Sequence, residues 1–277
     1  MSNKTFLVVG ATGTVASHVV TGLKATGARV KAASRKGEGT DGVAFDLADA
    51  STFGPALDGV DGVFLLVPGG VVDPYALAAP FLTAATKQHK KVVFMSVFGV
   101  DAVPEAPYSR LEKLLTSSGA PYAILRPNWF ADNFHSYWIH GVKTGVIAVP
   151  AGTGASSFID VRDIAASAVA ALTSSSFDNA AYNLTGPAAL TYAEAATLLS
   201  DVVDHPVRYQ HVEDEPFIQG LVGAGVPEDY ARFLTSIFEP VRLGYTAAVT
   251  GDVEQLTGKA PRSLTAYAKD NAARLKG

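Results

Sequence analysis

The segment TFLVVGATGTVA, residues 5–16, decides the fold of this chain. Its first five residues form an unbroken apolar run, which is typical of a parallel strand buried on both faces. Gly10, Gly13 and Ala16 follow at the spacing GxxGxxA. Gly10 permits a tight turn, Gly13 lets a phosphate approach the backbone, and Ala16 lets the next helix pack closely on the sheet. With a strand before it and a helical pattern after it, this turn predicts a dinucleotide site whose diphosphate faces the helix N-terminus.

Strand and helix patterns alternate through the first half of the chain, which is typical of a doubly wound parallel sheet. Further strands are expected at residues 29–33, 43–45, 62–67, 91–96 and 121–125, and helices at 15–26, 51–57, 74–89 and 105–118. The predicted fold class is therefore α/β, with a Rossmann-type sheet. Residues 1–130 are expected to form the dinucleotide-binding domain, with strands and a helix returning to it from about residues 146–185.

Helical patterns dominate the second half of the chain, at residues 192–203, 214–224, 228–243 and 264–275. Residues 131–277 are expected to form a smaller, mainly helical lobe that binds the substrate. The apolar helices near residues 233–241 fit either the surface of a homodimer or a wall of the substrate lobe, and the sequence leaves both open.

Composition excludes several classes of function. The 277 residues carry a formal net charge of -4 without a basic run, so nucleic acid is not an expected partner. The absence of cysteine excludes disulfides, thiolate metal ligands and Cys nucleophiles. No metal is expected either, because metal-ligand spacing is missing from the isolated histidines His135, His140, His205 and His211.

The chain also carries no membrane signal. A strand pattern begins at Thr5, which leaves no room for a signal peptide, and no apolar run approaches the ~20 residues needed to cross a bilayer. We therefore expect a cytoplasmic protein that acts on a small-molecule substrate.

The residues after the second strand indicate which dinucleotide is bound. Enzymes that use NAD usually place a carboxylate there to bind the ribose 2′-hydroxyl. This chain has Ser34, Arg35 and Lys36 instead. Arg35 can bind a 2′-phosphate that a carboxylate would repel, so NADP(H) is the expected cofactor, although Arg35 and Lys36 also fit a plain solvated loop. Asp46, after the third strand, is expected to contact the adenine.

The carboxyl ends of the remaining strands supply the rest of the site, since ligands of open α/β sheets lie at that edge. Val67 and Pro68 follow the fourth strand, and Ser96 ends the fifth. The predicted cofactor-binding residues are Gly10, Thr12, Gly13, Thr14, Val15, Ser34, Arg35, Asp46, Leu47, Val67, Pro68 and Ser96.

A dense aromatic group after the sixth strand predicts where the substrate binds. Aromatic faces suit a flat acceptor and also attract a cationic one, but half of these rings fit a plain core between lobes equally well. The predicted substrate-binding residues are Phe98, Asn128, Trp129, Phe130, Tyr137 and Trp138.

Several of these segments, in this order, resemble the NmrA-like, atypical short-chain dehydrogenase/reductase family over nearly the whole chain. The segments are residues 10–16, 34–35, 45–47, 125–130 with Asn133, and 158–165. Residues 225–231 and 253–263 look like the C-terminal signature of the family's festuclavine and agroclavine dehydrogenase group. The resemblance implies an NADPH-dependent reductase that acts on an iminium or another conjugated acceptor.

Ordinary short-chain dehydrogenases use a Tyr-x-x-x-Lys pair, in which the lysine lowers the tyrosine pKa so that the tyrosine can protonate an alkoxide. Here Glu112 stands four residues after Tyr108, and Lys113 points elsewhere on the helix. Reduction of a preformed iminium gives a neutral amine and needs no such acid. Tyr108 and Ser96, which matches the family's active-site serine, are the candidate catalytic residues, as hydrogen-bond donors.

Two other functions stay open at this stage. A quinone or azo-dye NAD(P)H reductase would use the same cofactor chemistry, because specificity lies in the shape of the pocket. A regulatory protein that binds NADP(H) without turnover is also compatible with the missing Tyr-Lys pair.

Overall fold

The computed structural model describes residues 4–276, which divide into two compact units. The Rossmann unit contains the chain up to Pro127 together with Val161–Leu184 and Asp252–Lys259. The C-terminal unit contains Asn128–Asp160, Thr185–Gly251 and the chain from Ala260 onward. The chain returns to the Rossmann unit at Val161 rather than near residue 146, because β7 (Val146–Val149) pairs with β11 (Arg208–His211) in the C-terminal unit.

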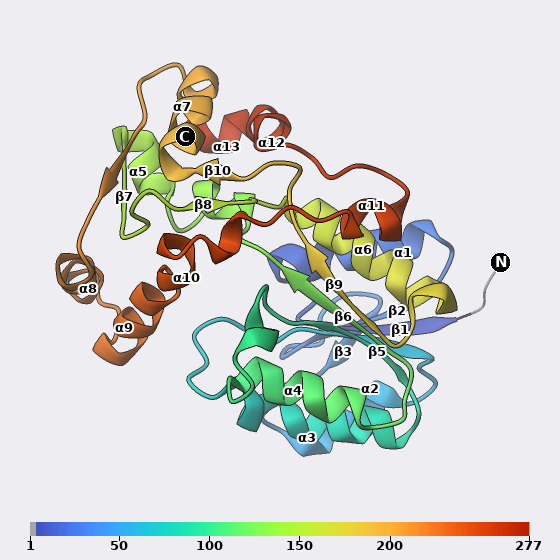
Figure 1. The fold of residues 1–277 in the computed structure, drawn as a ribbon. Coiled ribbons are helices and arrows are strands. Elements are labelled where there is room, and N and C mark those ends of the chain that lie inside the picture. The colour runs from blue at the N-terminus through green and yellow to red at the C-terminus, as the bar shows by residue number, and fades with distance from the viewer. Residues whose placement is uncertain (1–3, 277) are drawn as a thin grey trace. The chain divides into compact units, whose positions relative to one another are not determined.

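The Rossmann unit is built on a seven-stranded parallel sheet with the strand order β3-β2-β1-β4-β5-β6-β9 (Figure 1). Its strands are β1 (Thr5–Val9), β2 (Arg29–Ser34), β3 (Gly42–Ala44), β4 (Gly62–Leu65), β5 (Lys91–Met95), β6 (Tyr122–Pro127) and β9 (Ala180–Leu184). The five residues of β1 are all buried, as their apolar run predicts. The chain turns to one side of β1 through β2 and to the other through β4, so the strand order reverses beside β1.

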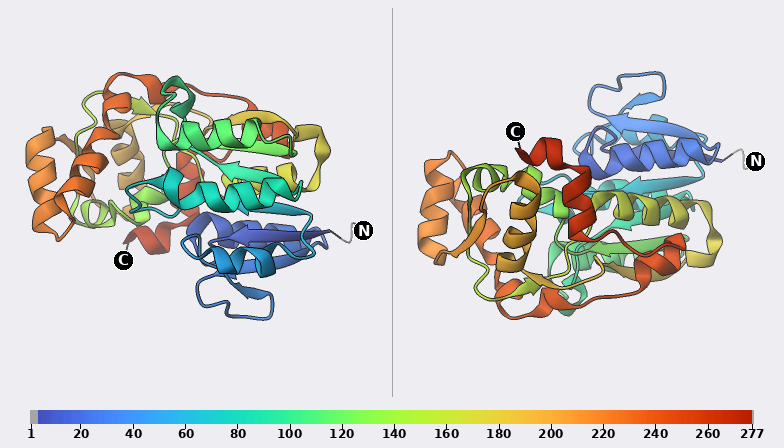
Figure 2. Two further views of the ribbon diagram at one scale, coloured as in Figure 1. Left: turned by 90° about the horizontal axis from the view of Figure 1, so that it is seen from below. Right: turned by 90° about the horizontal axis from the view of Figure 1, so that it is seen from above.

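Helices cover both faces of this sheet, as the two views in Figure 2 show. One face carries α1 (Thr14–Ala25) and α6 (Val161–Thr173), with α11 (Asp252–Thr257) packed on α6 and β9. The other face carries α2 (Phe53–Leu57), α3 (Pro74–Lys87) and α4 (Pro107–Thr116). Close packing of α1 on α6 depends on Gly22, because a Cβ there would lie 2.8 Å from Cγ2 of Val169. The predicted doubly wound α/β fold is confirmed.

The core on the α2–α3 face contains three phenylalanines in mutual contact. The ring of Phe81 lies 4.8 Å from that of Phe45 and 5.2 Å from that of Phe53, measured between centroids. All three side chains are buried. Their packing fixes α3 against the turn after β3 and so holds the end of the sheet that carries Asp46 and Leu47.

The C-terminal unit combines helices with two short pairs of strands. Its elements are η3 (Ala131–His135), α5 (Ile139–Thr144), β7, β8 (Ala155–Ser156), β10 (Leu190–Thr191), α7 (Tyr192–Val203), β11, α8 (Asp214–Gly223), α9 (Glu228–Ser236), α10 (Glu239–Arg242), η5 (Tyr245–Ala247), α12 (Leu264–Asp270) and α13 (Ala272–Lys276). The pair β7–β11 is parallel and the pair β8–β10 is antiparallel.

Two of the long helices expected in this unit are each broken in two. The helix expected over 228–243 ends at Ser236, because Pro240 has no N–H and its ring excludes a carbonyl of the preceding turn. Pro240 instead occupies the first turn of α10, where its missing N–H costs nothing. The helix expected over 264–275 is interrupted at Asn271, whose backbone N–H and side-chain amide both donate to the carbonyl of Tyr267.

Helix α7 begins with a capping box, which gives a test of local stability. The Thr191 hydroxyl accepts a hydrogen bond from the N–H of Glu194, whose carboxylate accepts one from the N–H of Thr191. Thr191→Ala should lower the free energy of unfolding by about 1 kcal/mol, measured by urea denaturation. Thr197→Ala, an exposed position on the same helix, is the control and should cost nothing, so equal losses would contradict the capping role.

Candidate functional site

The turn between β1 and α1 is shaped for an anion. Gly10 adopts φ +68°, and the N–H of Gly13 donates to the carbonyl of Gly10 at 2.8 Å. A Cβ on Gly10 would lie 3.3 Å from Cδ1 of Leu66, and a Cβ on Gly13 would lie 3.1 Å from the Gly10 carbonyl oxygen. The turn is therefore tight enough to disfavour side chains at both positions.

Gly13 is also the N-cap of α1, and it offers no side chain to the helix. The first-turn N–H groups of an α-helix have no acceptor within the helix, and they carry the positive end of its dipole. Ala16, one turn on, is completely buried and lets α1 lie close to the sheet. Thr12 and Thr14 are exposed at this turn and Val15 is buried beneath it, and their role in binding a diphosphate stays a prediction.

The chain after β2 presents two cations beside this cradle. Arg35 and Lys36 are exposed, and Lys36 Nζ lies 3.7 Å from a carboxylate oxygen of Glu38. Ser34 Oγ accepts the N–H of Gly37 at 3.1 Å. Gly37 has φ +63° and lies so close to β3 that a Cβ would be 2.6 Å from the backbone nitrogen of Ala44. The loop is thus folded back on β3, with Arg35 in solvent.

Asp46 and Leu47, expected to contact the adenine, follow β3. The Asp46 carboxylate accepts the N–H of Ala48 at 2.9 Å, and its own N–H donates to Oγ1 of Thr52 at 3.2 Å. Leu47 is buried in the core. The Asp46 side chain therefore stabilises its own turn while remaining half-exposed.

Ser96, just beyond β5, belongs to a hydrogen-bonded charge cluster that the sequence did not reveal. Its hydroxyl donates to Oε1 of Glu112 at 2.5 Å. Arg126, near the end of β6, donates to the same carboxylate through two nitrogens, Nε to Oε1 at 3.0 Å and Nη2 to Oε2 at 2.6 Å. A third nitrogen, Nη1, lies 2.7 Å from Oδ2 of Asp101 in η2 (Val100–Ala102). We call Ser96, Asp101, Glu112 and Arg126 the β5–β6 cluster.

Burial makes the Glu112–Arg126 pair strong. The Glu112 and Ser96 residues are 6% and 3% exposed. Burial alone would lower the pKa of Arg126, but hydrogen bonds and charge attraction from Glu112 and Asp101 outweigh it and raise the pKa. Glu112 occupies the position where a Tyr-x-x-x-Lys pair would place its lysine. The cluster therefore puts a paired carboxylate where ordinary short-chain dehydrogenases hold an ammonium group.

Tyr108, the other candidate catalytic residue, opens α4 and is half-buried. Its ring stacks on that of Phe94 in β5, with 6.1 Å between centroids. Phe98 follows Ser96 and is also half-buried, and its N–H donates to the carbonyl of Pro127. Val67 is buried and Pro68 exposed where the chain leaves β4. These residues all follow neighbouring parallel strands or open α4, and so belong to the carboxyl edge of the sheet.

The other predicted substrate residues lie in the C-terminal unit and contact its core. Trp129 stacks on Trp138 at 5.7 Å between centroids, and both rings contact that of Tyr192. Burial raises the pKa of the Tyr192 hydroxyl well above its ordinary value. Phe130 is half-buried and Tyr137 is 81% exposed. The rings of Trp129 and Trp138 therefore contribute to core packing, whatever else they contact.

Asn128 has a clear structural role. Its amide donates to Oγ of Ser157 at 2.7 Å and to the carbonyl of Thr246 at 2.8 Å, and its own oxygen accepts the N–H of Trp129. The side chain is buried, and these hydrogen bonds join the segment after β6 to the chain around β8 and η5.

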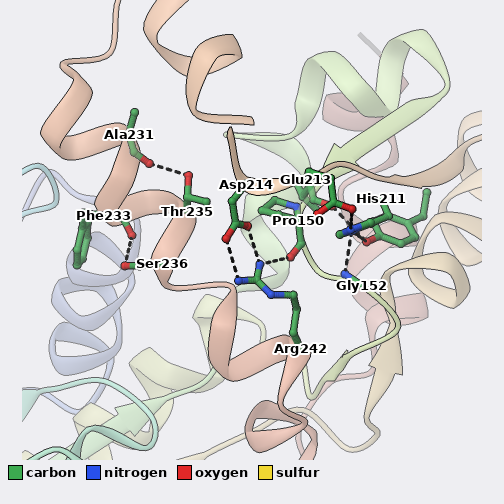
Figure 3. Close-up of polar contacts among 12 residues, drawn as sticks. Pro150, Gly152, His211, Glu213, Asp214, Ala231, Phe233, Thr235, Ser236 and Arg242 are labelled. Carbon is green, nitrogen blue, oxygen red and sulfur yellow. Dashed lines mark hydrogen bonds and ion pairs between the residues drawn. The ribbon is translucent and has the colours of Figure 1, made fainter. Parts of the chain in front are cut away.

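A polar cavity of about 370 Å³ lies among α8, α9 and α10 of the C-terminal unit. Figure 3 shows Arg242 between the Asp214 carboxylate, at 2.9 and 3.2 Å, and the carbonyl of Pro150, at 2.7 Å. Arg232, also on its wall, pairs with Glu228 at 2.7 Å. Both cations are thus paired with carboxylates, and the ion pair of Arg242 with Asp214 joins α10 to α8.

The described part of the chain, residues 4–276, holds no group of three or more His, Cys, Asp or Glu side chains arranged to bind a metal ion. Within the same residues, every helix is too short or too polar to span a membrane.

The sheet order, the glycine turn and the N-terminus of α1, which has no side-chain cap, define a Rossmann-type dinucleotide-binding fold. More specifically, the chain belongs to the NmrA-like family, whose model matches residues 2–268.

Similar proteins include named reductases and dehydrogenases. The NAD(P)H azoreductase of Xenophilus azovorans is 35% identical over 96% of this chain and 98% of its own length. The agroclavine dehydrogenase of Claviceps fusiformis is 29% identical over 96% of this chain and 97% of its own length. The structure of an NADPH-dependent quinone oxidoreductase of Escherichia coli matches with a TM-score of 0.83 and 22% identity, over 96% of this chain and 99% of that one.

The geometry of the β5–β6 cluster predicts a large effect of one substitution on stability. Glu112→Ala leaves the guanidinium of Arg126 without its bidentate partner, and should lower the free energy of unfolding by about 3 kcal/mol in chemical denaturation. Lys113→Ala, an exposed neighbour on the same helix, should change it by less than about 0.5 kcal/mol. A loss for Glu112→Ala no larger than that of the control would show that the pair does not stabilise the fold.

Proposed function

We propose that this protein is an NADPH-dependent reductase that transfers a hydride to a small, apolar, electron-poor acceptor. The observation that carries the proposal is the diphosphate cradle at Gly10–Ala16 next to Ser34 and Arg35, without a carboxylate at the end of β2. The named activities of the azoreductase and agroclavine dehydrogenase relatives support reductase chemistry.

NADPH, when bound, supplies the hydride, and the residues of the chain bind and orient it. The backbone N–H groups at the start of α1 hold the diphosphate, and Arg35 binds the 2′-phosphate. Val67, Pro68 and Ser96 lie at the strand ends where the nicotinamide is expected, beyond the reversal of strand order beside β1. We expect the protein to work in the cytoplasm, and a homodimer stays a prediction that light scattering would test.

The acceptor is most consistent with an iminium or another conjugated compound. Reduction of a simple ketone creates an oxyanion that needs an acid or a strong donor beside it. Near Ser96 this chain places the carboxyl group of Glu112, which forms an ion pair with Arg126, and the Ser96 hydroxyl donates to it. A hydroxyl that donates to a carboxyl group cannot at the same time stabilise an oxyanion on the substrate. An iminium carbon accepts a hydride and leaves a neutral amine, so no proton donor is required.

A quinone or azo-dye acceptor is the main alternative, and the azoreductase and quinone oxidoreductase comparisons support it. The reduced products of quinones and dyes delocalise or neutralise charge, so their reduction also does not depend on a strong acid in the site. A regulatory protein would bind NADP(H) at the same turn as the proposed reductase but would not reduce an acceptor.

The first test is oxidation of NADPH and NADH, followed by the absorbance of the reduced nicotinamide, with iminium salts, quinones and azo and cationic dyes. We expect turnover of cyclic iminium salts with NADPH. Turnover of quinones or dyes but not iminium salts would favour the alternative reductase. Tight binding of NADPH, measured by calorimetry, without turnover of any acceptor would instead support the regulatory function.

The role of Arg35 predicts a change of cofactor preference. Arg35→Ala should raise the KM for NADPH about tenfold or more, because a charge-assisted contact to the 2′-phosphate is lost, and should leave the KM for NADH within about twofold. Arg29→Ala is a matched control, because this exposed arginine lies at the opposite, N-terminal end of β2. Equal effects on both cofactors, or a wild-type preference for NADH, would overturn the assignment of Arg35.

A further inference from the structure

The β5–β6 cluster carries one charge more than it can pair. Its ionisable groups are two carboxylates, on Asp101 and Glu112, and one guanidinium, on Arg126. Arg126 directs two of its nitrogens to Glu112 and the third to Asp101. With all three groups ionised, the cluster has a net charge of one negative unit at the carboxyl ends of β5 and β6.

The geometry determines which side chain presents this charge. Glu112 is buried and is the acceptor of three hydrogen bonds, two from Arg126 and one from Ser96, so its charge is compensated inside the protein. The Asp101 side chain is 51% exposed and shares a single hydrogen bond with Arg126. The excess negative charge of the cluster is therefore presented to solvent at Asp101, in a position that Glu112 fixes through Arg126.

The sign of this charge is opposite to that of an ordinary short-chain dehydrogenase site. A Tyr-x-x-x-Lys pair places an ammonium group four residues after the tyrosine and stabilises developing negative charge. Here the same position holds Glu112, and the loop after β5 adds Asp101. Glu112 on α4 and Asp101 in η2 thus both make this edge of the sheet more negative.

We propose that Asp101 is the specificity-determining residue that selects a positively charged acceptor. The inference rests on the proposed reductase function and narrows its substrate class to cations. Arg126 and Glu112 act as positioning residues, since they hold the Asp101 carboxylate in place.

The reaction needs no further reagent. A hydride, which is one proton with two electrons, passes from the dihydronicotinamide of NADPH to the iminium carbon. A C–H bond of the dihydronicotinamide breaks, and a C–H bond forms at the iminium carbon while the C=N π pair moves to nitrogen. The products are a neutral amine and the cationic nicotinamide of NADP⁺, so no proton is exchanged. One positive charge passes from acceptor to cofactor, so a positive charge faces the excess negative charge of the cluster both before and after the transfer.

The experiment compares Asp101→Asn with wild type, using a cyclic iminium salt and a neutral quinone as acceptors. Asn keeps an oxygen that accepts from Arg126 and removes the charge. The KM for the iminium salt should rise about three- to fivefold, as expected for one exposed charge pair, while that for the quinone stays within about twofold. Added salt should raise the wild-type KM for the cation and have less effect on the variant.

Two further variants control for unrelated effects. Asp58→Asn removes an exposed carboxylate at the opposite, N-terminal edge of the sheet and should leave both KM values unchanged. Asp101→Glu keeps the charge and should restore most of the preference. A merely structural role for Asp101 would raise both KM values together, or would show as a loss of stability shared by both variants at position 101.

The inference and the proposed function fail in different ways. If wild type reduces acceptors but Asp101→Asn leaves the preference for cations unchanged, the inference is overturned and the reductase function stands. If NADPH binds and no acceptor is reduced, the reductase function is overturned. Binding of a cationic dye to the NADPH-bound protein, followed by fluorescence quenching, then still decides the inference, because weaker binding to Asp101→Asn would support it and equal binding would overturn it.

Discussion

The turn at Gly10 is the constraint on which the rest of the structure depends. Its φ of +68° is a conformation that residues with a Cβ rarely adopt, and Leu66 leaves little room for one. This turn carries the chain from β1, beside which the strand order reverses, into α1, so it fixes both the cradle and the packing of α1 on α6. A single backbone geometry thus links the fold of the Rossmann unit to its capacity to hold an anion.

The second determinant is the buried pairing of Glu112 with Arg126. A buried carboxylate is costly without a partner, and the planar fork of arginine satisfies both of its oxygens. The pair joins α4 to β6 and takes the Ser96 hydrogen as well. The chemistry of the edge follows from this arrangement. A serine that donates inward to a carboxylate offers little to an oxyanion, and this is the reason for proposing an acceptor that loses positive charge.

The sequence predicted the sheet well because its strands are continuous apolar runs separated by local turn signals, as in β1 and the turn at Gly10. The predictions were wrong where contacts between residues distant in the sequence determine the pairing of a strand. Val146–Val149 has the composition of a sheet strand, but its partner is Arg208–His211, a polar segment without a strand pattern. In the site, the glycine turn was readable from spacing, whereas the link between Asp101, Glu112 and Arg126 was not. Those residues lie on three elements, and only the folded sheet brings them together.

The two halves of the Rossmann unit differ in the sign of the charge that they present at the carboxyl edge of the sheet. On the β2 side of β1, the N-terminus of α1 and the exposed Arg35 present positive charge that matches the phosphates of a dinucleotide. On the β5–β6 side, Asp101 and Glu112 outnumber Arg126 and create a negative edge. A dinucleotide laid across the strand reversal would therefore place its anionic end on cations and its nicotinamide, which becomes positive on oxidation, toward carboxylates. The same field would draw a cationic acceptor to the nicotinamide, so the proposed cofactor orientation and the proposed acceptor class both rest on one distribution of charge along the sheet.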